Sequence, residues 1–367
     1  MSQSALRPCL INQERGCLLH KYDAVRKRWP RATRQMETGR RAAILSIRAS
    51  ENPNVTARRD PPETEPTPGR RDAEWGARLD AFNEYRPLLL SIAYRMLGSV
   101  ADAEDLVQDT FIRWQQTCNE AIKSPRAFLV TILSRLCINH LQSARVRREQ
   151  YVGSWLPEPL MTESTTASPA LTSPADDSLS MAFLLVLERL SPVERAVFLL
   201  REVFDYEYAE ISRIVGHKEA ACRQILRRAR QRVRSARPRF HVSSQHREDL
   251  FQRFQDASSR HDMKALIALL HDDVVLYADG GGKTAAVPRP VRGAANVARF
   301  ILRAPAKLLP KGLVRRRCNI NGQPAIVSYL DGRPHSVFSI EVAGDRLRNI
   351  YIVSNPDKLS RLPERPV

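Results

Sequence analysis

The segment LSPVERAVFLLREVFDYEYAEISRIVGHKEAACRQILRRAR, residues 190–230, carries the strongest structural signal in the sequence. Its start, SPVE (191–194), is a capping box with proline at the first helical position, so a helix begins there. A second helix, YEYAEISRIV, ends at Gly216, where a left-handed conformation costs little. A third helix, KEAACRQILRRARQRVR, follows directly. The segment therefore predicts a capped helix and then two helices joined by a tight glycine turn.

The third of these helices has one apolar and one basic face. Its residues Cys222, Ile225 and Val233 can pack against Ile211 and Val215 of the preceding helix. A basic helix after a glycine turn fits the major groove of DNA, and Arg and Gln side chains suit guanine and adenine edges. A helical hairpin with a solvated basic face is the alternative. The residues that we expect to point toward DNA are Lys218, Glu219, Arg223, Gln224, Arg227, Arg228 and Arg230.

Three more helices are predicted upstream, between residues 76 and 152. The first, LDAFNEYRPLLLSIAYRMLG, has an apolar stripe that includes Leu79 and Met96, and Gly98 is a plausible C-cap. Ser99 begins the second, VADAEDLVQDTFIRWQQ, and Ser124 with the proline after it begins the third. The second helix buries Ala103, Val107, Phe111 and Trp114. Its opposite face then presents Glu104, Asp105, Gln108 and Asp109.

The overall composition favours a polyanionic partner. The chain of 367 residues has 58 Lys and Arg against 40 Asp and Glu, a net charge of +18. Such a field attracts nucleic acid or an anionic membrane surface, unless it reflects only an arginine-rich composition. No apolar run approaches the roughly 18 residues of a membrane span, and no signal peptide is recognisable. The six cysteines are scattered, so we expect reduced, mostly buried thiols in a cytoplasmic protein and neither disulfides nor a metal site.

Changes in composition divide the chain into segments. The leader has arginine-rich and proline-rich stretches, and it could be a basic arm on DNA, a passive extension or a misassigned start. The expected segments are a leader (1–75), a helical domain (76–152), a linker (153–179), a helix-turn-helix domain (180–240), a C-terminal domain (246–360) and a tail (361–367).

The C-terminal domain has the pattern of an α+β fold. One helical segment (247–270) precedes alternating strands separated by Asn-Gly, Asp-Gly and Gly-Asp dipeptides, which are hairpin signals. His271, Tyr277 and Asp279 could form an acid–base set. However, the glycines after Asp279 predict a turn, and no nucleophile accompanies the set. We therefore expect no catalytic site and no cofactor.

Several of these segments resemble one known family. DAEDLVQDTFIRW (102–114) and SPRAFLVTILSRLCINHLQSARVRRE (124–149) resemble region two of extracytoplasmic-function (ECF) sigma factors, and 190–230 resembles their region four. WLPEP (155–159), DGGGK (279–283) and NPDKL (355–359) resemble a SigJ-like subgroup with a fused SnoaL-like domain. The resemblance covers about 80–360. It implies two all-α domains, the second a helix-turn-helix, followed by an α+β SnoaL-like (cystatin-like cone) domain with a curved antiparallel sheet.

The resemblance also implies partners and roles. The acidic helix face at Glu104, Asp105, Gln108 and Asp109 would dock on the clamp helices of the largest subunit of core RNA polymerase; a merely solvated face is the alternative. Region four would bind the −35 element of promoter DNA. The linker would pass through the RNA exit path of the polymerase. Region two would read and open the −10 element with a basic surface made by Arg135, Asn139, Arg145, Arg147 and Arg148.

The fused domain is implied to replace a separate anti-sigma protein. We expect its two motifs to contact the linker and to set the spacing of the DNA-binding domains; simple turns are the alternative for DGGGK. A small molecule or protein effector of this domain is left open. The expected regulatory contacts are Trp155, Leu156, Pro157, Asp279, Gly280, Gly281, Gly282, Lys283, Asn355, Pro356, Asp357 and Lys358.

Two other functions compete with this interpretation. A freestanding helix-turn-helix regulator would bind an operator without polymerase, but it leaves the 102–149 region without a purpose. A small-molecule sensor or enzyme would use the C-terminal pocket and keep the helical half as a tether. Turnover or tight ligand binding by the C-terminal region would favour the latter.

Overall fold

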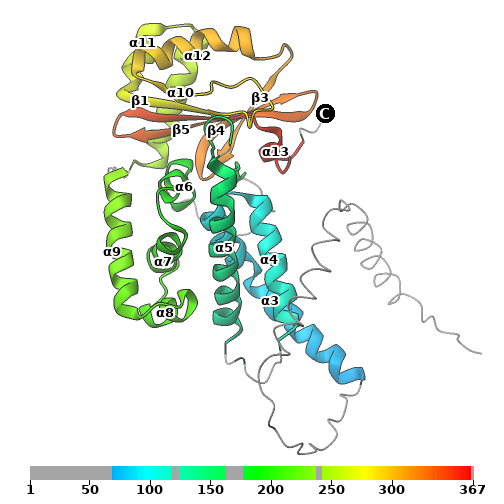
Figure 1. Cartoon of the computed structure of the whole chain (residues 1–367). Coiled ribbons are helices and arrows are strands. Elements are labelled where there is room, and N and C mark those ends of the chain that lie inside the picture. Colours follow the sequence, from blue (N-terminus) through cyan, green and yellow to red (C-terminus); the bar gives the residue numbers. More distant parts are fainter. Residues whose placement is uncertain are drawn as a thin grey trace, which may run out of the picture. The chain divides into compact units, whose positions relative to one another are not determined.

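The computed structural model describes residues 68–117, 122, 124–149, 151–162, 177–236 and 242–364, without the side chains of 68–75, 144–149, 177, 236 and 304–308 (Figure 1). Most of the expected leader and the middle of the linker lie outside these residues. The first described helix, α3, begins at Pro68, within the segment expected to be leader.

The first helical domain consists of α3 (Pro68–Leu97), α4 (Val100–Gln115) and α5 (Pro125–Glu149). Gly98 has φ +67° and follows α3, and the Ser99 side chain accepts a hydrogen bond from the Asp102 amide at the start of α4, as predicted. Ala103, Val107 and Trp114 are buried, and Phe111 is half-buried against the ring of Phe82. Leu79 was expected in the apolar stripe but is 37% exposed, so the stripe is not buried over its whole length.

The second helical domain contains the predicted helix-turn-helix. Its elements are η3 (Asp177–Leu179), α6 (Met181–Leu187), α7 (Pro192–Glu202), α8 (Tyr208–Val215) and α9 (Glu219–Ala236). The capping box at Ser191 and Glu194 is present, and Gly216 has φ +74°. One continuous apolar core joins both helical domains, since it runs from Phe82 in α3 to Ala229 in α9.

The C-terminal domain is a mixed six-stranded sheet with helices. Its elements are α10 (Ser244–Ser259), α11 (Met263–Leu269), β1 (Leu270–Asp279), β2 (Val291–Arg292), α12 (Ala294–Leu308), β3 (Val314–Ile320), β4 (Gln323–Leu330), β5 (Arg333–Ala343), β6 (Arg346–Val353) and α13 (Pro356–Leu359). The strand order is β2-β1-β6-β5-β4-β3. The three predicted hairpin dipeptides connect β3 to β4, β4 to β5 and β5 to β6, with positive φ at Asn321, Asp331 and Gly344.

Two details of this domain differ from expectation. The sheet is not wholly antiparallel, because β1 pairs with β6 in parallel after the chain has crossed through α12. The single helix expected at 247–270 is two helices, because His261 has φ +56° and Asp262 caps a new helix by accepting from the Ala265 amide. Residue 270 already belongs to β1.

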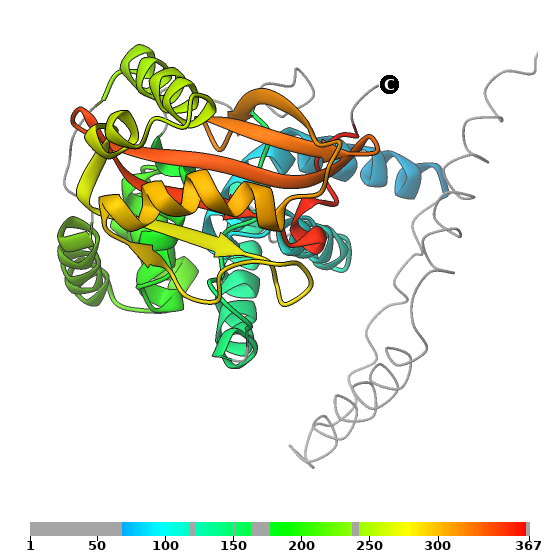
Figure 2. The same cartoon turned by 90° about the horizontal axis from the view of Figure 1, so that it is seen from above.

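The two faces of the sheet bury different partners. Figure 2 shows α12 lying across the sheet, and the core on that face also includes Phe251 and Phe254 of α10. The opposite face carries Tyr329, which packs in one cluster with Leu156 of the linker and Met181 of α6. Side chains alternate between the faces of a strand, so one sheet serves as a wall for both clusters.

Asn321, in the turn between β3 and β4, connects this sheet to three other segments. It is fully buried, and its Nδ2 donates to Tyr94 Oη of α3 (2.6 Å) and to the Leu179 carbonyl (2.9 Å). Its Oδ1 accepts from the Leu160 amide (3.0 Å), and its own amide donates to the Leu160 carbonyl (2.8 Å). One side chain thus satisfies polar groups of the linker and of both helical domains.

Replacing this side chain is expected to destabilise the protein. Asn321→Ala leaves the Leu160 amide and the Leu179 carbonyl without their partner and keeps a left-handed residue, so we expect a loss of about 2–4 kcal/mol of unfolding free energy. Urea denaturation of the full chain measures it. Asp331→Ala is the matched control: its φ is +49° in an exposed turn, and we expect a loss of only about 1 kcal/mol. Equal losses would contradict the role of the buried amide.

Candidate functional site: the helical surfaces and the interdomain junction

The helix-turn-helix presents the basic edge that the sequence predicts. The side chains of Lys218, Gln224, Arg227 and Arg228 are exposed and make no hydrogen bond or ion pair with the described residues. The other predicted residues have partners. Arg223 pairs with Glu219 (2.9 Å) and lies over the Tyr208 ring. Arg230 pairs with Glu202 (2.5 Å).

The acidic face of α4 is mostly open. Asp105, Gln108 and Asp109 are exposed, whereas Glu104 is half-buried and forms an ion pair with Arg361, two residues beyond α13. Burial, and then the neighbouring charge of Asp102, raise the pKa of Asp105. The predicted polymerase-binding face is therefore in contact with the C-terminal end of the described chain at one of its four residues.

The predicted −10 surface lies partly against the second helical domain. Arg135 of α5 donates to the carbonyls of Ile214 (3.0 Å) and Arg213 (2.9 Å), at the C-terminal end of α8, where a cation is favourable. Asn139 is exposed. The side chains of Arg145, Arg147 and Arg148 lie outside the described residues.

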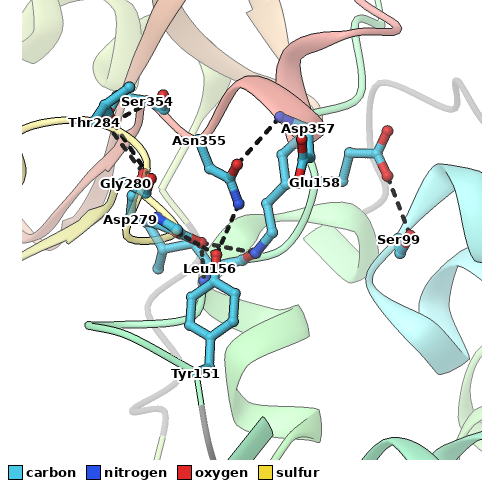
Figure 3. Close-up of polar contacts among 12 residues, drawn as sticks. Ser99, Tyr151, Leu156, Glu158, Asp279, Gly280, Thr284, Ser354, Asn355 and Asp357 are labelled. Atoms are coloured by element: carbon cyan, nitrogen blue, oxygen red, sulfur yellow. Dashed lines mark hydrogen bonds and ion pairs between the residues drawn. The ribbon is translucent and has the colours of Figure 1, made fainter. Parts of the chain in front are cut away.

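The three short motifs of the sequence meet at Asp279 (Figure 3). This residue ends β1 and is fully buried. Its Oδ1 accepts from Tyr151 Oη (2.6 Å) and the Gly281 amide (3.0 Å), and its Oδ2 accepts from the Leu156 amide (2.9 Å) and Lys358 Nζ (2.7 Å). Four donors from the linker, from the glycine turn and from α13 thus compensate one buried charge.

Lys358 completes this junction from the other side. Its ammonium donates to the Leu156 carbonyl (2.5 Å) and lies 4.4 Å from the centre of the Trp155 ring and 5.1 Å from that of Tyr151. Burial, and then the hydrogen bond to the carboxylate, raise the pKa of Tyr151, so its hydroxyl keeps the proton that it donates. The linker is therefore held through its backbone and its aromatic side chains.

The turn beside Asp279 requires glycine for a steric reason. Gly281 has φ +60°, and a Cβ there would lie 2.3 Å from Nδ2 of Asn355. That Nδ2 donates to Tyr151 Oη (2.9 Å), while Oδ1 of Asn355 caps α13 by accepting from the Asp357 amide (3.1 Å). The Lys283–Asp357 pair joins the same two motifs at the surface, at 2.5 Å. DGGGK and NPDKL therefore form one contact surface.

Glu158, the acidic residue of WLPEP, is a contact that the sequence reasoning missed. It is buried, and its Oε2 accepts from the amides of Val100 (2.7 Å) and Ala101 (3.2 Å) and from the Ser99 hydroxyl (3.2 Å), at the N-terminus of α4. Burial raises the pKa of Glu158 despite these hydrogen bonds, which act in the opposite direction. A carboxylate suits a helix N-terminus, but no local pattern indicates that the helix lies 58 residues upstream.

The proposed acid–base residues do not form a set. The Asp279 carboxylate is bound as described above, Tyr277 stacks on Tyr351 (5.9 Å between ring centres), and His271 Nδ1 accepts from the Asp273 amide. Within the described ranges, no group of His, Cys, Asp and Glu has the arrangement of a metal site. None of the helices described is long and apolar enough to cross a membrane. Cys137, Cys222 and Cys318 are buried free thiols.

Comparison with known proteins agrees with this architecture. Residues 81–147 match the family Sigma-70 region 2, and residues 180–233 match Sigma-70, region 4. The ECF RNA polymerase sigma factor SigJ of Mycobacterium tuberculosis is 36% identical over 299 residues, which are 78% of this chain and 94% of SigJ. This chain belongs to the ECF family of RNA polymerase sigma factors.

Two further matches extend over most of this sigma factor. A probable ECF sigma factor of M. tuberculosis, SigI, is 30% identical over 77% of this chain and 94% of its own length. The crystal structure of M. tuberculosis SigJ superimposes with a TM-score of 0.63 at 34% identity, covering 77% of this chain and 98% of that one. The family and the fold class predicted from the sequence are thereby confirmed.

Breaking the buried pair is expected to cost far more than breaking the exposed one. Lys358→Met leaves the Asp279 charge without its cation, so we expect a loss of about 3–5 kcal/mol in unfolding free energy and a change in Trp155 fluorescence. Lys283→Met removes a pair that is more than half exposed on both sides, and we expect a loss below about 1 kcal/mol. Denaturant titrations of both full-length variants make the comparison. A similar, small loss in the two would show that the junction is not held by the buried charge.

Proposed function

We propose that this sigma factor uses α4 to bind core RNA polymerase, α5 to engage the −10 element and α9 to engage the −35 element. We also propose that its C-terminal domain regulates these steps by holding the linker. Membership of the ECF family supports promoter recognition with RNA polymerase as its general activity. The observation that carries the regulatory part is the Asp279 junction, which ties the linker between the two helical domains to the sheet.

Polymerase binding through α4 rests on charge and exposure. Asp105, Gln108 and Asp109 form an open acidic and polar row, and the same helix buries its other face in the core. A surface of this kind favours a basic protein partner by electrostatic complementarity. Arg361, just after α13, forms an ion pair with Glu104 on this face. The end of the C-terminal domain and the polymerase therefore compete for part of it.

The two helical domains are packed together in this structure, and we call this arrangement the closed state. Elements centred near −35 and −10 are about 25 base pairs apart, which is roughly 85 Å along DNA at 3.4 Å per base pair. Here α5 and α8 are in direct contact through Arg135, and the two domains share a core. They cannot bind both elements in this arrangement. We infer that they separate when the promoter is engaged.

We propose that the C-terminal domain acts through contacts and not through catalysis. The carboxylate of Asp279, its strongest acid–base candidate, accepts hydrogen bonds from the linker, the glycine turn and α13. A freestanding operator-binding regulator would leave the open face of α4 without a role. Transcription with purified core polymerase distinguishes a sigma factor from such a regulator.

Reversing the charge of the exposed face of α4 is expected to reduce initiation. The double variant Asp105→Lys, Asp109→Lys should lower run-off transcription at least about tenfold, which corresponds to a loss of 1.4 kcal/mol or more in polymerase binding. The matched control is Asp249→Lys with Asp272→Lys, which reverses two exposed acids of the C-terminal domain. Unchanged affinity of the α4 variant for core enzyme would refute docking through this face.

Separation of the helical domains can be measured directly. Spin labels on unnatural ketone side chains at Gln142 of α5 and Arg234 of α9, both exposed, should move apart by tens of ångströms when core polymerase and promoter DNA are added. Pulsed EPR reads the distance. A second label pair within the first domain, at Asn83 of α3 and Gln142, should keep its distance. An unchanged α5–α9 distance in an active transcription complex contradicts the closed-to-open proposal.

A further inference from the structure

The C-terminal domain contains a large cavity between its sheet and its helices. The volume is about 880 Å³, and the lining comes from α10, α12 and strands β1, β3, β4, β5 and β6. Cavities of roughly 300–1,000 Å³ that are mostly apolar hold organic ligands in proteins. The principal apolar residues of the wall are Phe254, Phe300, Ile326, Phe338 and Ile352.

Strand register sorts the lining of the sheet into two rows. One row runs across the strands from Arg317 to Ile326, Phe338 and Ile352, because these residues pair in order. The neighbouring row begins with Arg315, which pairs with Ser328; Ser328 pairs with Ser336. The cavity therefore has an apolar strip on its floor and, beside it, a strip of hydroxyl groups that ends in a cation.

The two arginines at the β3 end differ in their partners. Arg317 pairs with Glu248, donates to Gln252 and lies over the Phe251 ring. The Arg315 side chain is exposed, and its guanidinium makes no ion pair or hydrogen bond with any described residue. Nδ1 of His335 is buried at the wall, also without a hydrogen-bond partner among the described residues. The polar end of the cavity thus offers one uncompensated positive charge and an unsatisfied polar atom.

We propose that this cavity binds an apolar organic acid. Its ring or chain body lies on the Ile326–Phe338–Ile352 strip, oxygen substituents face the Ser328 and Ser336 hydroxyls, and its anionic group pairs with Arg315. A guanidinium without an internal partner favours a carboxylate or sulfonate over a neutral head group.

The wall of the cavity continues into the Asp279 junction. Ser354 and Thr284 both line the cavity, and their hydroxyls are 2.9 Å apart. The Ser354 hydroxyl also donates to the Asp279 carbonyl (3.3 Å), and that of Thr284 donates to the Ser354 carbonyl (3.1 Å). A ligand that displaces Ser354 moves the residue that binds the linker. This regulatory consequence rests on the proposed function, whereas the binding itself does not.

Two probes that differ only in a charged group test the site in the full-length protein. 8-Anilinonaphthalene-1-sulfonate carries the anion, and N-phenyl-1-naphthylamine is the same skeleton without it. Arg315→Gln should weaken sulfonate binding about tenfold and leave the neutral probe unchanged, as measured by fluorescence titration. Arg316→Gln is the matched control, because the next residue of β3 points to the opposite face of the sheet. It should change neither affinity.

Filling the cavity gives an independent variant. Ser328→Phe places a ring over the hydroxyl strip and should remove binding of both probes while circular dichroism and melting temperature stay near those of the parent protein. Sulfonate affinity that is unchanged in both Arg315→Gln and Ser328→Phe overturns the site. Equal weakening of both probes by Arg315→Gln overturns the assignment to an anion.

Coupling to the linker is read separately by hydrogen exchange. In the parent protein, saturating sulfonate probe should change protection of the 151–158 segment, whose Leu156 amide donates to Asp279, at least twofold. Unchanged exchange with the probe bound overturns the regulatory consequence. Neither measurement uses polymerase, so a failure here is distinct from a failure of the transcription tests above.

Discussion

The buried carboxylate of Asp279 is the constraint on which the interdomain arrangement depends. It has no exposed surface, so donors from the protein must replace the water that it lost on folding. Those donors come from three segments. Tyr151 and Leu156 of the linker lie 128 and 123 residues before Asp279, Lys358 of α13 lies 79 residues after it, and the glycine turn is adjacent. Withdrawing Lys358 leaves a buried charge without its cation, at about 3–5 kcal/mol, and withdrawing a neutral donor removes a hydrogen bond to a charged group, at about 1.5–3 kcal/mol. The three segments are therefore either all in place or all displaced.

The linker connects the Asp279 site to α4 through consecutive contacts. Leu156 is held by Asp279 and packs on the sheet, and two residues later Glu158 caps α4, the helix that we propose to bind polymerase. Its amide also donates to the Gly98 carbonyl (2.8 Å), and Tyr94 Oη donates to its carbonyl (2.8 Å). A segment of four consecutive buried residues (156–159) thus links the C-terminal domain to the first helical domain. We infer that a displacement on one side of this segment reaches the other side through direct contacts.

The features that could be predicted from the sequence are those with local causes. The capping box at Ser191, the glycine turn at 216 and the hairpin dipeptides depend on a few neighbouring residues, and all formed as expected. The contact of three motifs at Asp279 was suggested only because a family resemblance grouped them. Three other features depend on segments far apart in the chain. They are the contact of the Glu158 carboxylate with the N-terminus of α4, the parallel pairing of β1 with β6, and the hydrogen bonds of Asn321. The helix break at His261 was local, but a left-handed histidine gives no pattern comparable to Asn-Gly.

Three contacts between the domains differ in strength, and the difference indicates where the closed state opens. The exposed Arg361–Glu104 pair is worth about 1 kcal/mol or less, and the two hydrogen bonds of Arg135 are worth about 1.5–3 kcal/mol each. The Asp279–Lys358 pair is buried and costs about 3–5 kcal/mol to break. Polymerase and DNA also compensate directly for the first two losses, because both would bind the residues that are released. Separation of α5 from α8 also divides the apolar core that the two helical domains share, so polymerase and promoter must compensate for this loss as well. We infer that the linker stays on the sheet meanwhile, so that the C-terminal domain remains docked and limits how far the proposed DNA-binding helices can move apart.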